Sequence, residues 1–121
     1  MQIAQKNFYK KFLGRAGEVK AAEFLKKKGY KILEKNYKTP LGEIDIIATD
    51  KEYIVFIEVK TRSGDEYGAP SEAVNLKKQQ KYHKTALYYL QRNKKMDEPC
   101  RFDVIEIEDG QINHILNAFS M

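Results

Sequence analysis

Two short patterns give this chain the residue types of a metal-assisted hydrolytic site. Glu43 and Asp45 are separated by one residue, and so are Glu58 and Lys60. Because alternate residues of a β-strand project from the same face, each pair is expected to share a face. Carboxylates and a lysine beside apolar strands are costly to bury unless they pair or bind a metal ion. Hard oxygen ligands favour Mg²⁺ or Mn²⁺ over Zn²⁺.

The chemistry expected of this set is phosphodiester hydrolysis. Asp45 and Glu58 would hold the cation, which would polarise the scissile phosphate and lower the pKa of the attacking water. Lys60 would orient that water or stabilise negative charge in the transition state. Glu43 is assigned an auxiliary catalytic role.

Glu18 is a candidate third metal ligand. It lies four and seven residues before Ala22 and Leu25, so all three share one face of an expected helix. That placement would direct the carboxylate toward the sheet. The alternative is a surface ion pair with Arg15 or Lys20, and the sequence leaves both open.

An ordinary structural explanation also exists for the strand residues. Glu43 or Asp45 could form a cross-strand salt bridge with Lys60, which is a common and weakly stabilising arrangement. Acid-x-acid and acid-x-lysine patterns also arise often by chance.

The elements that must position these residues follow from hydrophobic periodicity and turn signals. A C-cap glycine at Gly29 marks the end of the first helix, and an N-cap asparagine at Asn75 marks the start of the second. The expected helices cover about 10–28 and 76–93, and the expected strands about 30–37, 43–49, 53–61, 101–108 and 111–116. The order αβββαββ predicts an α/β fold, or α+β with a mixed sheet. Residues 43–61 should form an antiparallel hairpin, and residues 63–70 a loop.

Length and composition indicate a folded domain over residues 1–121. Cys100 is the only cysteine, which excludes an intrachain disulfide and favours a reducing compartment. The N-terminal residues lack an apolar signal core, and no apolar run is long enough to span a bilayer. We therefore expect a cytoplasmic protein without a membrane partner.

Charge is unevenly distributed around the net value of +5. Residues 1–38 carry 11 basic and 3 acidic groups, and residues 76–96 carry 7 basic and no acidic groups. Basic segments suit a nucleic-acid partner, although solvated lysine faces on helices explain them equally simply. The residues predicted to contact nucleic acid are Arg62, Lys77, Lys78, Gln79 and Lys81. His114 is interpreted as structural.

These motifs resemble the PD-(D/E)XK nuclease superfamily, which has the restriction-endonuclease-like fold. Ile44-Asp45 stands at the Pro-Asp element without its proline, and Glu58-Val59-Lys60 matches the E-x-K element. Glu18 falls where some members, including archaeal Holliday-junction resolvases, carry an additional acidic ligand. Gln79 matches only the first residue of the superfamily's Gln-x-x-x-Tyr element.

A closer resemblance covers almost the whole chain. Its motifs are similar to those of the YraN-like family of bacterial proteins, which is grouped with nucleases largely by such resemblance. They are Gly14-Arg15-x-Gly17-Glu18, Gly29-Tyr30, Asn36-Tyr37, Gly42-Glu43-Ile44-Asp45, Phe56 to Arg62, Gly68-x-Pro70-x-Glu72-Ala73-Val74 and Lys78-Gln79.

The resulting hypothesis is a Mg²⁺- or Mn²⁺-dependent endonuclease that acts on DNA more readily than on RNA, with branched or structured DNA among the candidate substrates. The alternative is a non-catalytic nucleic-acid-binding module on the same fold. A protein-interaction domain that has lost the chemistry is a third reading. The analogy with resolvases further suggests a homodimer.

Overall fold

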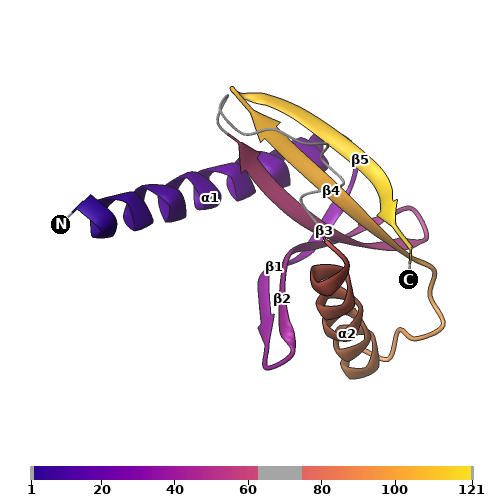
Figure 1. Ribbon diagram of the computed structural model, residues 1–121. Coiled ribbons are helices and arrows are strands. Elements are labelled where there is room, and N and C mark those ends of the chain that lie inside the picture. The colour runs from indigo at the N-terminus through magenta and orange to yellow at the C-terminus, as the bar shows by residue number, and fades with distance from the viewer. Residues whose placement is uncertain (1, 63–74, 121) are drawn as a thin grey trace.

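The computed structural model describes residues 2–62 and 75–120, with side chains from residue 14 onward (Figure 1). The order αβββαββ predicted from the sequence is confirmed. The elements are α1 (Gln2–Lys27), β1 (Lys31–Thr39), β2 (Gly42–Asp50), β3 (Tyr53–Arg62), α2 (Leu76–Arg92), β4 (Cys100–Glu108) and β5 (Gln111–Phe119). The first helix begins earlier than expected, near residue 2 and not near residue 10. The predicted loop at 63–70 and the motif from Gly68 to Val74 lie outside the described residues.

The five strands form one mixed sheet in the order β1-β2-β3-β4-β5. Neighbouring strands are antiparallel except β3 and β4, which are parallel and are connected through α2. This confirms the predicted mixed α/β class and the 43–61 hairpin, and it agrees with the restriction-endonuclease-like core that the resemblance implied. No helix among the described residues is long and apolar enough to cross a membrane.

The two helices cover opposite faces of the sheet. Ala21, Ala22 and Leu25 of α1 pack in a cluster with strand residues such as Ile57. On the other face, Tyr82, Ala86, Tyr89 and Leu90 of α2 pack in a cluster with residues such as Phe56 and Phe102. Apolar residues of β3 and β4 contribute to both clusters, and β3 is apolar without interruption from Tyr53 to Ile57, as is typical of strands buried on both faces.

Glycine lets α1 approach the sheet closely. A Cβ atom built on Gly17 would lie 2.2 Å from Thr61 Oγ1 on β3, whereas one built on Gly14 would meet nothing within 4 Å. Any other residue at position 17 would therefore push the helix or Thr61 aside. The close approach of Gly17 to Thr61 sets the distance between α1 and β3. Glu18 is the next residue of the helix. In Figure 1 the N-terminal turns of α1 extend beyond the edge of the sheet.

Candidate active site

The β1–β2 hairpin bends away from β3 at Asp45. Pairing between β2 and β3 stops at Ile46 with Ile57. Ile46 packs in the cluster beneath α1, whereas Ile44 packs in the cluster beneath α2. Regular alternation along β2 is therefore broken at Asp45, because Ile44 and Ile46 lie on opposite faces of the sheet. On β1, Asn36 has a φ of 52°, a left-handed conformation that asparagine tolerates better than most residues.

Asp45 fills the gap where β2 leaves β3. Its Oδ2 atom accepts a hydrogen bond of 2.8 Å from the backbone N–H of Val59. The carboxylate thus replaces the ladder hydrogen bond that β2 would otherwise supply to β3. Glu58 precedes Val59, so the second predicted metal ligand lies beside the first. The bend brings the two carboxylates together at a place where both are partly buried.

The pKa values of these two carboxyl groups are raised. Burial raises the pKa of Asp45 to about 6, and the charges of Glu18 and Glu43 act in the same direction, while the hydrogen bond from Val59 opposes them. Burial raises the pKa of Glu58 to about 7, with the charge of Asp45 as the next cause. Each carboxylate therefore makes the other harder to ionise. A divalent cation between them would remove this repulsion.

Two lysines from different elements face this negative charge. Lys78, in the first turn of α2, acts to lower the pKa of both Asp45 and Glu58, and Lys60 acts on Glu58. Neither lysine forms an ion pair of 4 Å or less with a carboxylate among the described residues. The cross-strand salt bridge from Lys60 to Glu43 or Asp45, the ordinary explanation of the pattern, is thus not found. Sequence reasoning placed Lys78 on nucleic acid alone and missed its proximity to the carboxylates.

Glu18 and Glu43 lie near Asp45, since the charges of both raise its pKa. Together with Asn36, they line a groove of about 670 Å³ between α1 and β1. Burial raises the pKa of Glu18, and a hydrogen bond with Asn36 opposes that effect. No three His, Cys, Asp or Glu side chains in the described part of the chain converge as a metal-binding group. Asp45 and Glu58 therefore form a pair, and the role of Glu18 as a third ligand stays a prediction.

The residues predicted to contact nucleic acid occupy two different environments. Lys77 and Lys81 are exposed on the first turns of α2, and Gln79 beside them is half-buried. Arg62, at the end of β3, is only 8% exposed, and its Nε atom lies 3.0 Å from Glu106 Oε2. The helix residues are accessible to a phosphate backbone, whereas the guanidinium of Arg62 neutralises a buried carboxylate. Direct contacts of these residues and of Lys78 with nucleic acid stay predictions.

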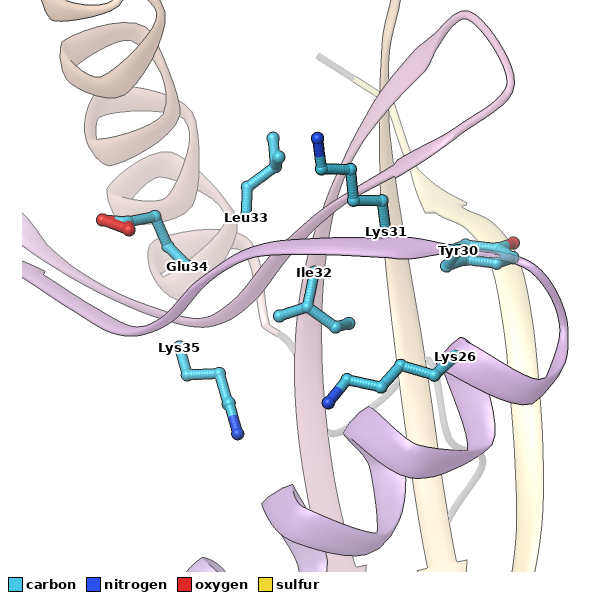
Figure 2. Close-up of a pocket in the computed structure, with 7 residues that line it drawn as sticks. All are labelled: Lys26, Tyr30, Lys31, Ile32, Leu33, Glu34 and Lys35. Atoms are coloured by element: carbon cyan, nitrogen blue, oxygen red, sulfur yellow. The ribbon is translucent and has the colours of Figure 1, made fainter.

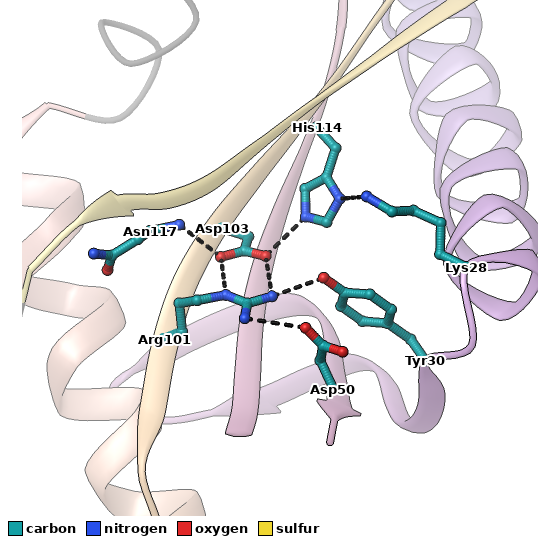
Figure 3. A network of polar contacts seen from close by, with 7 residues as sticks. All are labelled: Lys28, Tyr30, Asp50, Arg101, Asp103, His114 and Asn117. Atoms are coloured by element: carbon teal, nitrogen blue, oxygen red, sulfur yellow. Dashed lines mark hydrogen bonds and ion pairs between the residues drawn. The ribbon is translucent and has the colours of Figure 1, made fainter. Parts of the chain in front are cut away.

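A second buried polar cluster lies around Asp103 on β4 (Figure 3). Its carboxylate accepts two hydrogen bonds from Arg101, of 2.9 and 3.0 Å, and one from the Asn117 backbone N–H. His114 Nε2 lies 2.7 Å from the same carboxylate, and Lys28 Nζ lies 2.9 Å from His114 Nδ1. Since an ammonium group only donates, His114 accepts at Nδ1 and donates at Nε2. This confirms the structural interpretation of His114.

Arg101 connects the cluster to two further elements. It donates to Tyr30 Oη at 2.7 Å and to Asp50 at 3.1 Å. Burial alone would raise the pKa of Asp103, but the hydrogen bonds from His114, Arg101 and Asn117 hold it below its usual value. The alternation of Arg101 and Asp103 on one strand was the only local signal for this cluster, because its other members are distant in sequence.

Comparison with known proteins identifies the family. The model of uncharacterised protein family UPF0102 matches residues 17–107. The chain belongs to this family. A UPF0102 protein of Thermodesulfovibrio yellowstonii is 58% identical over 107 residues, covering 88% of this chain and 95% of the relative. One from Caldanaerobacter subterraneus is 52% identical over 121 residues, covering 94% and 99%. The resemblance to YraN-like proteins is thereby confirmed, and the UPF0102 match includes Glu18, Asp45, Glu58 and Lys60.

Proposed function

We propose that this UPF0102 protein is a divalent-metal-dependent nuclease that hydrolyses phosphodiester bonds, with DNA as the principal substrate. The observation that supports it most directly is the pair formed by Asp45 and Glu58. These carboxylates are partly buried beside one another, their pKa values are raised, and no ion pair neutralises them within the described residues. Such an arrangement is unfavourable for stability and is typical of functional sites.

The donor set fits a hard divalent cation. Asp45 and Glu58 offer only carboxylate oxygens, and no histidine or cysteine accompanies them in the described residues. Mg²⁺ sites in proteins often use one or two carboxylates and leave the other positions to water and substrate phosphate. Partial exposure of both groups gives a phosphate access to this position. Mn²⁺ has the same preference for oxygen ligands.

Each side chain of the site then has a role. Asp45 and Glu58 would hold Mg²⁺ or Mn²⁺, and the bound cation would supply the positive charge that polarises a phosphodiester and lowers the pKa of a water molecule. The Val59 N–H fixes the orientation of the Asp45 carboxylate. Lys60 orients the attacking water or stabilises negative charge as the phosphorus–oxygen bond breaks. Glu43, at the edge of the site, is auxiliary.

The surroundings favour a polyanionic substrate. Lys77, Lys78 and Lys81 are exposed along the first turns of α2, and the charge of Lys78 acts on both carboxylates. Lysines in such a row contact phosphates without reading the base sequence. Binding through them would weaken as the salt concentration rises, because each phosphate contact releases counterions.

The test is cleavage of labelled single-stranded, duplex, tailed and branched DNA, and of matching RNA, with Mg²⁺, Mn²⁺ or EDTA. Asp45→Asn and Lys60→Gln should each lower the cleavage rate by at least about 100-fold. Glu52→Gln, at an exposed position in the β2–β3 turn, is the matched control and should cleave normally.

Three outcomes decide between the readings. Metal-dependent cleavage that both site variants lose supports the nuclease. Cleavage unchanged in Asp45→Asn and Lys60→Gln contradicts the site. Salt-sensitive binding with no cleavage of any substrate favours the non-catalytic nucleic-acid-binding module.

A further inference from the structure

Two neighbouring hollows run along the seam between α1 and β1. The first, of about 600 Å³, is lined by Lys26 and by Tyr30 to Lys35. The second, of about 670 Å³, is lined by Gly14, Arg15, Glu18, Val19, Lys35, Asn36, Lys38 and Glu43. Because Lys35 lines both, the two hollows adjoin. We call them together the α1–β1 groove.

The lining of this groove includes five cations, Arg15, Lys26, Lys31, Lys35 and Lys38, and three carboxylates, Glu18, Glu34 and Glu43. Of the cations, Arg15 and Lys26 come from α1, and the other three come from β1. Figure 2 shows the side chains of Lys26 and Lys35 extending into the space between the helix and the strand. The ion pairs found within the described residues all involve Arg62, Arg101 or His114, so these five cations stay available to a ligand.

The groove leads to the candidate active site. Glu18 and Glu43 line its second hollow, and both contribute to the raised pKa of Asp45. Cations line both hollows, Glu34 lines the first, and Glu18 and Glu43 lie in the second hollow, at the end nearest Asp45. A polyanion that follows the cations would be repelled at this end unless a divalent cation neutralised the carboxylates. This arrangement would bring a phosphate to Asp45 only when the metal is bound.

The dimensions favour one strand over a duplex. Hollows of this size are in the range of about 300–1,000 Å³ that holds drug-sized ligands, so each suits about one or two nucleotides. Arg15 and Lys26 are 11 residues apart on α1, a rise of about 17 Å.

Apolar side chains accompany the cations. Val19 is 55% exposed in the second hollow, and Ile32, in the first hollow, extends to the same side of β1 as Lys35 (Figure 2). A cationic groove with apolar patches suits a single strand, because the phosphates meet the cations while unpaired bases cover the apolar surface.

The geometry points to a single-strand-binding groove between α1 and β1 that guides one strand of the substrate into the active site. This inference rests on the proposed nuclease function. The substrate class it assigns is nucleic acid with an unpaired segment next to the scissile phosphate, such as a fork, a flap or an overhang. The unpaired segment lies in the groove, and its first phosphate on the paired side lies at Asp45 and Glu58.

The test compares Lys35→Gln/Lys38→Gln with Lys51→Gln/Lys94→Gln. The control lysines are exposed in turns outside the groove, and both variants lose two positive charges. Binding of a blunt duplex and of the same duplex with a single-stranded tail is measured at several salt concentrations. Asp45→Asn is included in each protein, so that the strand stays intact. Cleavage of both substrates is measured separately with Mn²⁺ and Asp45 restored.

We expect the groove variant to bind the tailed substrate at least about ten-fold more weakly and the blunt duplex normally. The slope of log affinity against log salt for the tailed substrate should fall by about 1.4, at about 0.7 per lost phosphate contact. The control variant should match the parent protein on both substrates.

Other outcomes separate this groove from the proposed function. Equal weakening for tailed and blunt substrates overturns the assignment to single strands. Normal tailed binding by the groove variant, with cleavage retained, overturns the groove and leaves the nuclease standing. Groove-dependent binding of the tail with no Mn²⁺-dependent cleavage supports the groove and contradicts the nuclease.

Discussion

Asp103 and the Asp45–Glu58 pair are carboxylates buried in the same sheet, but their surroundings differ in kind. Asp103 is fully buried and accepts hydrogen bonds from Arg101, His114 and a backbone N–H. These donors hold its pKa below the usual value. Asp45 accepts one backbone hydrogen bond, and burial raises its pKa to about 6.

The difference shows what each region contributes. In the Asp103 cluster, donors balance acceptors, so burial of the charge is compensated. The cluster connects β2, β4, β5 and the residues directly after α1. At Asp45 and Glu58, hydrogen-bond acceptors outnumber donors. Folding partly buries both carboxylates, which makes their negative charge unfavourable. A protein can retain such a pair when a ligand supplies the missing positive charge.

The largest expected change in the free energy of unfolding comes from a substitution in the Asp103 cluster. Asp103→Asn removes the charge opposite Arg101 and places an amide N–H₂ among groups that donate. We expect unfolding to become easier by about 3–5 kcal/mol, as for other buried ion pairs that lose one partner. Urea denaturation measures the change. Asp109→Asn is the matched control, because Asp109 is exposed in a turn at a φ of 49° that asparagine also adopts. Equal stability of the two variants would show that the cluster is dispensable.

Removing the charges at the candidate site is expected to raise the stability of the protein, not to lower it. Asp45→Asn/Glu58→Gln should stabilise the metal-free protein by about 2–3 kcal/mol at pH 8, after allowance for partial solvent access. The folded-state pKa values of about 6 and 7 lie above the usual values of 3.8 and 4.5. The wild-type carboxyls therefore support folding fully below pH 4, and that support is lost as the pH rises through 6 and 7. The two proteins should thus be closest in stability near pH 4.

Thermal denaturation across pH 4–8, with and without Mg²⁺, measures this difference. Mg²⁺ should stabilise the wild type and leave the double variant unchanged, since binding to the native state alone raises stability. A stability difference that is independent of pH would mean that the two carboxylates are compensated after all.

Much of this arrangement could be predicted from local sequence patterns. Alternation predicted that Glu58 and Lys60 share a strand face, whereas helical spacing left Glu18 either on the sheet side of α1 or in a surface ion pair. The element order and the mixed sheet followed from the same periodicities, because burial on defined faces imposes them.

Features that depend on distant residues were missed. The bend at Asp45 lies opposite the left-handed Asn36 of the neighbouring strand, and no local pattern marks where β2 must leave β3. The cluster around Asp103 draws Lys28 and His114 from positions 86 residues apart. Such long-range pairings are set by the packing of the whole sheet.

The next test concerns α1, which contacts both regions. Glu18 of α1 lines the groove beside the site, and Lys28, directly after α1, contacts His114 of the Asp103 cluster. Gly17→Ala places a methyl group against Thr61 Oγ1 and should destabilise the protein by about 1–3 kcal/mol. Gly14→Ala meets nothing and should stabilise the helix by up to about 1 kcal/mol. Adding Thr61→Ala should restore most of the loss in Gly17→Ala. A loss that persists in the double variant would mean that Thr61 does not set the height of α1.

The smallest expected change concerns Lys78, whose charge lowers the pKa of both Asp45 and Glu58. Lys78→Gln should raise the pKa values of Asp45 and Glu58 further, by about half a pH unit or about 0.7 kcal/mol each. Carboxyl titration followed by NMR measures this, and the exposed neighbour Lys77 provides the control variant Lys77→Gln. Because the carboxylates must ionise to bind a cation, the lower limb of any metal-dependent activity should move to higher pH in Lys78→Gln only. Equal titration in both variants would place Lys78 with the lysines that contact only substrate.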